Sequence, residues 1–121
     1  MNETYFFDTY AIFELINGND KYKKFKDVLG LTTIFNIAEL NYALKRELSK
    51  SEADELTENF YKLLIDIELD DIKKAMDLRG KYKKMSPPDV IGYTVAQRLG
   101  IKFLTGDEDF KDFDNVELVK K

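Results

Sequence analysis

Short apolar runs alternate with helix-like stretches along the whole chain, and this alternation constrains the fold more than any other feature of the sequence. The short runs predict strands, and the stretches between them predict helices. Strands joined through helices form right-handed crossovers, which produce a parallel sheet covered by helices. We therefore predict one domain over residues 1–121. Its class is α/β, a three-layer fold with a mainly parallel central sheet of four to five strands and helices on both faces.

The boundaries of these elements follow from local sequence signals. We predict strands at residues 5–7, 31–35, 65–69, 101–104 and 116–119. The run 65–69 alternates apolar and acidic residues, which favours a half-exposed edge strand. We predict helices at residues 9–17, 21–29, 36–48, 51–64, 70–84 with an interruption at Gly80, and 86–99. Three helix starts carry a polar residue and an acid three positions later, as in a capping box: Asn36 with Glu39, Ser51 with Asp54, and Ser86 with Asp89.

The side-chain inventory limits the chemistry that is open to the chain. Its 121 residues include no histidine and no cysteine, which excludes imidazole bases, thiolate nucleophiles, disulfides and the usual zinc sites. Carboxylate oxygens remain, and they suit hard cations such as Mg²⁺ or Mn²⁺. The net charge of −4 argues against a protein that coats nucleic acid non-specifically, but it does not exclude a nuclease.

Four acids stand near the points where a strand or loop passes into a helix or turn: Asp8, Glu39, Asp89 and Asp107. Each alone has an ordinary structural explanation as a helix cap, a capping-box acid or a turn residue. Together they map to the edge where the strands of an α/β sheet end and ligands bind. Clustered carboxylates repel one another unless a cation lies between them. The sequence therefore predicts a divalent-cation pocket and, with it, phosphate chemistry.

The segments around these acids resemble those of a known family. They are Phe7-Asp8-Thr9, Ile37-Ala38-Glu39-Leu40, Ser86-Pro87-Pro88-Asp89-Val90-Ile91 and Phe103-Leu104-Thr105-Gly106-Asp107-Glu108-Asp109-Phe110. In this order and spacing they resemble the PIN-domain ribonucleases, and within that family the VapC-type toxins. The two prolines before Asp89 depart from the usual pattern.

The resemblance implies a Mg²⁺- or Mn²⁺-dependent endoribonuclease. By this resemblance the catalytic acids and metal ligands are Asp8, Glu39, Asp89 and Asp107, with Asp109 as a fifth possible ligand. The hydroxyls of Thr9 and Thr105 would orient a carboxylate or a water. The resemblance also implies a small antitoxin protein as partner and a homodimer, with the strongly apolar helix 9–17 forming part of an antitoxin groove or, equally, an internal core helix.

RNA would be held by basic and aromatic side chains. Tyr42, Tyr82 and Tyr93 are candidates, although Tyr93 lies one turn after Asp89 and fits core packing better. The lysine clusters along the chain are typical of solvated helix faces when each is taken alone. The N-terminus carries no basic segment, and no apolar run approaches the roughly 20 residues of a membrane span. We expect a soluble, cytoplasmic protein.

Two other classes of function stay open. A phospho-acceptor receiver domain would use Asp70 or Asp71 after a strand at 65–69, with Lys120 near the last strand. Asp8 stands alone after the first strand, whereas receivers need a pair of acids there. A non-catalytic PIN-like binding module is the second alternative. The sequence does not separate a toxin from an RNA-processing nuclease.

Overall fold

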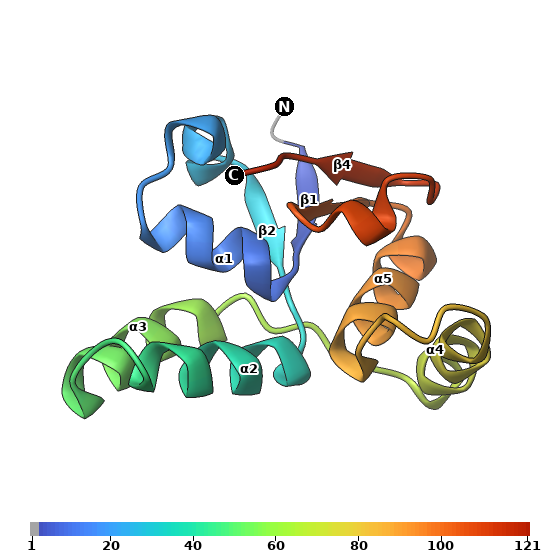
Figure 1. Ribbon diagram of the computed structural model, residues 1–121, viewed down its shortest axis with the longest axis horizontal. Coiled ribbons are helices and arrows are strands. Elements are labelled where there is room, and N and C mark those ends of the chain that lie inside the picture. Colours follow the sequence, from blue (N-terminus) through green and yellow to red (C-terminus); the bar gives the residue numbers. More distant parts are fainter. Residues whose placement is uncertain (1–2) are drawn as a thin grey trace.

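The computed structural model describes residues 3–121 as a sheet with helices on both faces (Figure 1). The elements in chain order are β1 (Thr4–Phe7), α1 (Thr9–Ile16), the 3₁₀ helix η1 (Asp20–Lys26), β2 (Leu29–Leu31), α2 (Ile34–Lys45), α3 (Lys50–Tyr61), α4 (Leu69–Lys81), α5 (Pro87–Leu99), β3 (Lys102–Thr105), the 3₁₀ helix η2 (Glu108–Phe110) and β4 (Val116–Leu118). The strands pair in the order β2-β1-β3-β4, and every pair is parallel. The predicted α/β class and parallel sheet are confirmed.

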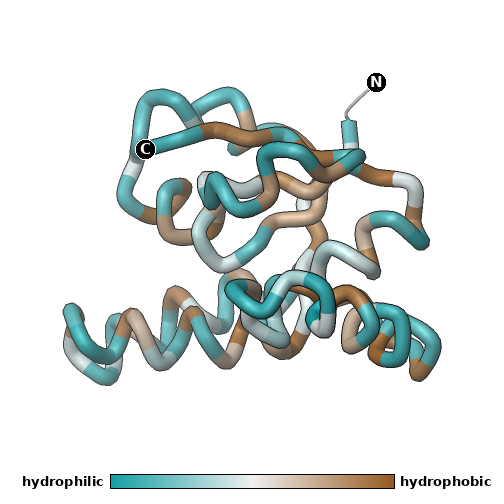
Figure 2. The backbone as a smooth tube through the Cα atoms, turned by 45° about the vertical axis from the view of Figure 1, so that its right-hand side comes forward, coloured by the Kyte–Doolittle hydropathy of each residue, from teal (hydrophilic) through white to brown (hydrophobic). Residues whose placement is uncertain are grey.

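Alternation along the central strands creates two hydrophobic cores. Tyr5 and Phe7 of β1 belong to a core shared with α1, η1, α2 and α3, whereas Phe6 belongs to a core shared with α4 and α5. Leu104 and Phe103 of β3 divide in the same way. Successive strand residues point to opposite faces, so one sheet separates the two cores. The lower helices in Figure 2 correspondingly alternate between hydrophilic and hydrophobic bands.

Several predicted helices form with small shifts in their ends. Ser86 caps α5 as predicted, and Gly100 closes it in the left-handed conformation at φ 68°. The cap of α3 is Ser49 rather than Ser51. The stretch predicted as a helix at 21–29 is the shorter 3₁₀ helix η1, and Gly80 lies within α4 without interrupting it.

Two predicted strands are wrong in position or existence. The chain leaves β2 at Leu31 and enters α2 at Ile34, because the Thr33 side chain caps the helix. Asn36 therefore lies in the first turn of α2 rather than at its cap, and it forms no capping box with Glu39. The predicted edge strand 65–69 is absent from the described residues, which hold only one isolated bridge there, between Thr32 and Leu64.

Asp71 links the two helices of the second core. It lies in α4, is 2% exposed, and accepts a hydrogen bond of 2.9 Å from Nε of Arg98 in α5. The Asp71 side chain also accepts from the backbone N–H of Glu68 at 2.9 Å. Asp70 and Asp71 both lie in the first turn of α4, and no strand precedes them at 65–69 within the described residues. Neither is a phospho-acceptor at a strand end, so the receiver interpretation is wrong.

No helix within residues 3–121 is long and apolar enough to cross a membrane.

Candidate active site

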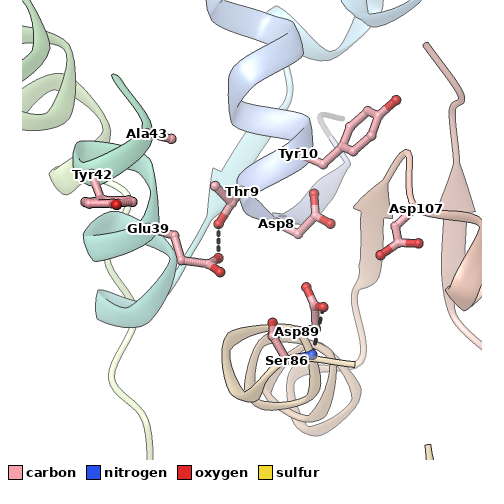
Figure 3. A pocket seen from close by; sticks show the side chains of 9 residues that line it. All are labelled: Asp8, Thr9, Tyr10, Glu39, Tyr42, Ala43, Ser86, Asp89 and Asp107. Atoms are coloured by element: carbon pink, nitrogen blue, oxygen red, sulfur yellow. Dashed lines mark hydrogen bonds between the residues drawn. The ribbon is translucent and has the colours of Figure 1, made fainter. Parts of the chain in front are cut away.

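The four predicted acids line one pocket at the carboxyl ends of the strands. The pocket has a volume of about 340 Å³ and is lined by Asp8, Thr9, Tyr10, Glu39, Tyr42, Ala43, Ser86, Asp89 and Asp107. Figure 3 shows Glu39 and Asp107 on opposite sides of one open space, with Asp8 and Asp89 between them. The acids come from the end of β1, from α2, from the start of α5 and from the segment after β3. The sheet topology thus brings together side chains that are far apart in the sequence.

Asp8 lies between the end of β1 and the start of α1. Its Oδ1 accepts a hydrogen bond of 2.8 Å from the backbone N–H of Ala11, so it also caps α1. Its side chain is almost completely buried, and this loss of solvation raises the pKa of Asp8 to about 8, against the opposing hydrogen bonds from Thr105 and Ala11. The negative charges of Asp89 and Asp107 raise it further. A buried carboxylate in this position favours either a proton or a cation.

Glu39 is held by a chain of hydrogen bonds. The Thr9 hydroxyl donates to Oε1 of Glu39 at 2.7 Å, and Nδ2 of Asn36 donates to the Thr9 oxygen at 3.1 Å. The Thr33 hydroxyl in turn donates to Oδ1 of Asn36 at 2.7 Å. Burial raises the pKa of Glu39, with the Thr9 bond opposing the shift and the charge of Asp89 adding to it. The orienting role predicted for Thr9 agrees with this geometry.

Asp89 occupies the third position of α5, as the sequence predicts. Its Oδ2 accepts from the backbone N–H of Ser86 at 3.1 Å, while its own N–H donates to Oγ of Ser86 at 3.3 Å. This reciprocal capping box fixes the side chain toward the pocket. Burial raises the pKa of Asp89 against the Ser86 bonds, and the charges of Asp107 and Asp109 raise it further. The interpretation of Asp89 as a capping acid is therefore confirmed, and the same side chain lines the pocket.

Asp107 sits on the turn after β3. Its N–H donates to Oγ1 of Thr105 at 3.0 Å, and its Oδ1 accepts from the N–H of Asp109 at 2.9 Å. The preceding Gly106 lies so close to the Tyr10 ring that a side chain at this position would overlap the ring. Asp109 is not among the residues that line the acid pocket. It lines a neighbouring hollow instead.

No positive side chain balances the acids of the pocket. Arg and Lys are absent from its lining, and none of the ion pairs within residues 3–121 includes one of the four acids. Within the same residues, no group of three or more acids already has a metal-binding arrangement. The donor set nevertheless fits a hard divalent cation, because it consists of carboxylate oxygens without a counter-charge, one from the buried Asp8 and the others from partly buried acids.

Other polar and aromatic residues differ in whether they reach the pocket. Tyr42, a predicted RNA contact, is 70% exposed at the pocket, and the Arg46 guanidinium lies 5.9 Å from its ring centre. Tyr93 is 4% exposed and packs in the core, as expected. Asn36 and Tyr10 were not identified from the sequence. The sequence around Asn36 is typical of a helix cap. No sequence signal marks Tyr10, which reaches the pocket because its ring packs over Gly106.

Comparisons with known proteins agree with this fold. A family model described as the PIN domain matches residues 5–116. No curated protein is similar enough in sequence to count as a match. Three solved structures superimpose over nearly the full length of both chains, and at their identities the likeness concerns the fold.

The first of these structures is a toxin–antitoxin complex from Klebsiella pneumoniae, with a TM-score of 0.76, 21% identity, and coverage of 96% of this chain and 98% of the other. The second is VapC20 of Mycobacterium tuberculosis, a sarcin–ricin loop cleaving toxin, with a TM-score of 0.77, 17% identity and coverage of 94% and 98%. The third is VapBC2 of Rickettsia felis bound to a promoter DNA fragment, with a TM-score of 0.73, 19% identity and coverage of 97% and 98%.

Proposed function

Because the chain belongs to the PIN domain family, we propose that it is a metal-dependent endoribonuclease of the VapC type that hydrolyses RNA phosphodiester bonds. One observation carries the proposal. Four carboxylates from four separate elements line a single pocket without a counter-charge. Gathering carboxylates that have no positive counter-charge costs free energy, so an arrangement of this kind is expected where a cation or a reaction needs it.

The acids have distinct roles in this proposal. Asp8 and Asp89 hold Mg²⁺ or Mn²⁺ directly, and Asp107 and Asp109 contribute directly or through water. When bound, the cation supplies positive charge to the phosphate oxygens. Glu39, oriented by the 2.7 Å hydrogen bond from Thr9, positions the attacking water and accepts its proton. A carboxylate with a raised pKa is the better proton acceptor near neutral pH, and burial raises the pKa of Glu39.

The chain's place in a toxin–antitoxin pair is a further part of the proposal. It is supported by the likeness to a toxin–antitoxin complex and to a toxin that cleaves the sarcin–ricin loop. An apolar hollow of about 330 Å³ offers a surface for an antitoxin segment, with Leu15 of α1, Phe25, Phe60 and Leu63 in its lining. Phe13 and Ile16 of α1 are also only partly buried. A short antitoxin reading frame directly upstream, whose product blocks RNA cleavage, would support this role over RNA processing.

Homodimer formation has its own measurement. Sedimentation of the purified chain should show two copies per particle. A monomer would remove the homodimer from the proposal and leave the nuclease site unaffected, because all four pocket acids come from one chain.

Cleavage of a labelled single-stranded RNA tests the nuclease proposal. We expect cutting with Mg²⁺ or Mn²⁺, none with EDTA, and a loss of at least about a hundredfold in Asp8→Asn and Asp89→Asn. Asp77→Asn is the matched control, because Asp77 is an exposed acid of α4 outside the pocket. This control should cut like the unmodified protein. Equal cutting by all four proteins, or no cutting together with no divalent-ion binding by calorimetry, would leave the non-catalytic binding module as the better explanation.

A further inference from the structure

A second hollow lies beside the acid pocket and carries the opposite charge. It has a volume of about 270 Å³ and is lined by Lys81, Tyr82, Lys83, Lys84, Met85 and Asp109. We call it the basic hollow. All but Asp109 belong to the end of α4 and the loop that leads to α5. The loop therefore places three lysines and one tyrosine around a single concave surface.

The lysines of the basic hollow are available to a ligand. All three are exposed, and no ion pair within residues 3–121 includes Lys81, Lys83 or Lys84. Lys45 and Lys50 differ in this respect, since both contact Asp54 at 3.0 Å. Three unpaired cations on one short segment attract an anion with several charges.

Tyr82 presents a fixed aromatic surface in the same hollow. Its side chain is 46% exposed, and its ring meets Phe113 edge-on with 4.9 Å between the ring centres. The backbone carbonyl of Tyr82 accepts a hydrogen bond of 3.1 Å from the N–H of Met85, whose side chain is 2% exposed. The loop is thus anchored by Met85 while part of the Tyr82 ring stays open to solvent. A ring held in this way is suited to stacking with a base.

The basic hollow and the acid pocket share two segments of chain. Met85 lines the hollow and the next residue, Ser86, lines the pocket. Asp109 lines the hollow, and Asp107, two residues earlier, lines the pocket. The negative charge of Asp109 is also close enough to Asp89 to raise the pKa of that acid. A polymer that occupies the pocket can therefore continue into the hollow.

We propose that the basic hollow binds the RNA strand on one side of the bond to be cleaved, with Lys81, Lys83 and Lys84 on its phosphates and a base stacked on Tyr82. The inference rests on the proposed function, because that function supplies the RNA. RNA fits the hollow better than an acidic peptide does, since it offers both regularly spaced charges and flat bases. The strand would reach its scissile phosphate at the acid pocket, where Tyr42 is the exposed ring.

Binding in EDTA tests the hollow without any cleavage. The probe is a fluorescent, unstructured single-stranded RNA, and its affinity is measured by anisotropy over a series of salt concentrations. In the triple variant Lys81→Gln, Lys83→Gln, Lys84→Gln, the slope of log affinity against log salt should fall in magnitude by about 2, because each phosphate contact contributes about 0.7 on a single strand. Tyr82→Leu should weaken binding roughly tenfold, and Tyr82→Phe should restore it.

A second lysine cluster provides the matched control. Lys21, Lys23 and Lys24 are exposed on η1, which lies far from the α4–α5 loop in Figure 1. Their triple change to Gln removes the same charge and should leave the salt slope close to that of the unmodified chain. Equal losses in both triple variants would show general electrostatic attraction and would overturn the proposal. Unchanged RNA affinity in the Lys81 triple variant would also overturn the proposal. This holds equally if an acidic peptide is found to bind the basic hollow instead.

A short substrate separates this inference from the proposed function. A dinucleotide reaches only the acid pocket, so the Lys81 triple variant should cleave it at the normal rate while cleaving long RNA more slowly. Failure of the unmodified protein to cleave either substrate would contradict the proposed function. Normal cleavage of long RNA by the triple variant would contradict the basic hollow alone. Thermal unfolding of each variant confirms that its fold is intact.

Discussion

Asp8 is the most deeply buried of the four pocket acids, and its protonation should be visible in the stability of the protein. Its folded-state pKa is about 8, against about 4 for an ordinary aspartate. The folded state therefore keeps a proton that the unfolded state loses between these two values. Without divalent ions, the free energy of unfolding should fall as the pH rises from about 4 to about 8 and should then level off.

The Asp8→Asn variant removes this proton exchange while an amide oxygen still caps α1. In EDTA it should be more stable than the unmodified protein at about pH 8, by up to about 5 kcal/mol, with little difference near pH 4. Urea unfolding across this range gives the measurement, and Asp77→Asn should follow the unmodified curve. A parallel pH dependence in Asp8→Asn and the unmodified protein would show that another group titrates.

At the scale of single residues, the sequence predicted the acids better than it predicted their supports. Asp8 and Asp89 were identified because each lies at a helix start, where the chain direction fixes the side chain. Asn36 was assigned to a helix cap, although it lies in the first turn of α2 and donates a hydrogen bond to Thr9. That contact joins residues 27 positions apart, and no local pattern can indicate it.

At the scale of elements, the ion pair between Asp71 and Arg98 fixes α4 against α5. Burial raises the pKa of Asp71, but the Arg98 hydrogen bond and the Glu68 N–H outweigh this effect and hold the pKa below its usual value. Asp71→Asn should lower the free energy of unfolding by about 2 kcal/mol in urea titrations at neutral pH. The loss should shrink as the pH falls below about 4, because the unfolded state then takes up a proton on Asp71, and it should vanish below the lowered folded-state pKa.

Asp70 is the matched control for this element. It neighbours Asp71 in sequence, but its side chain is 78% exposed and only reaches Lys73 at 4.0 Å. Asp70→Asn should change the stability by less than about 0.5 kcal/mol. If the two variants lost equal stability, the effect would belong to the helix N-terminus rather than to the pair with Arg98.

The predicted strand at 65–69 shows why element types can be misassigned. Ile65 and Ile67 alternate with acids, which is typical of an edge strand, and both pack against the second core. Both belong to an irregular segment. Next to it the described residues form a single isolated bridge, between Leu64 and Thr32. The β-branched run at 31–35 also predicted a strand, but the Thr33 side chain caps a helix that begins at Ile34. Strand formation needs a partner, and the sequence does not state where that partner lies.

At the scale of the whole molecule, the acid pocket spans the two halves that the sheet separates. Glu39 lies on α2, which packs in the first core, and Asp89 lies on α5, which packs in the second. A cation bound between them should stabilise the whole fold. Mg²⁺ or Mn²⁺ at a hundred times its dissociation constant should add about 2.7 kcal/mol to the free energy of unfolding.

Thermal unfolding with MgCl₂, compared with NaCl of the same ionic strength, measures this effect. The shift should be much smaller in Asp89→Asn and should disappear when EDTA is added. An undiminished shift in Asp89→Asn would place the stabilising cation somewhere other than the acid pocket.

The strand order also determines when the site can first exist during synthesis. β1 comes first in the chain but lies between β2 and β3, and its partner β3 is made of Lys102–Thr105. Asp8 therefore leaves the ribosome long before Asp107, and the two meet only after β3 and the turn that follows it have been translated. An incomplete chain cannot assemble the four acids. If the protein is a toxin, a nascent copy that has not yet reached Asp107 lacks a complete site, which gives its antitoxin time to bind before the site forms.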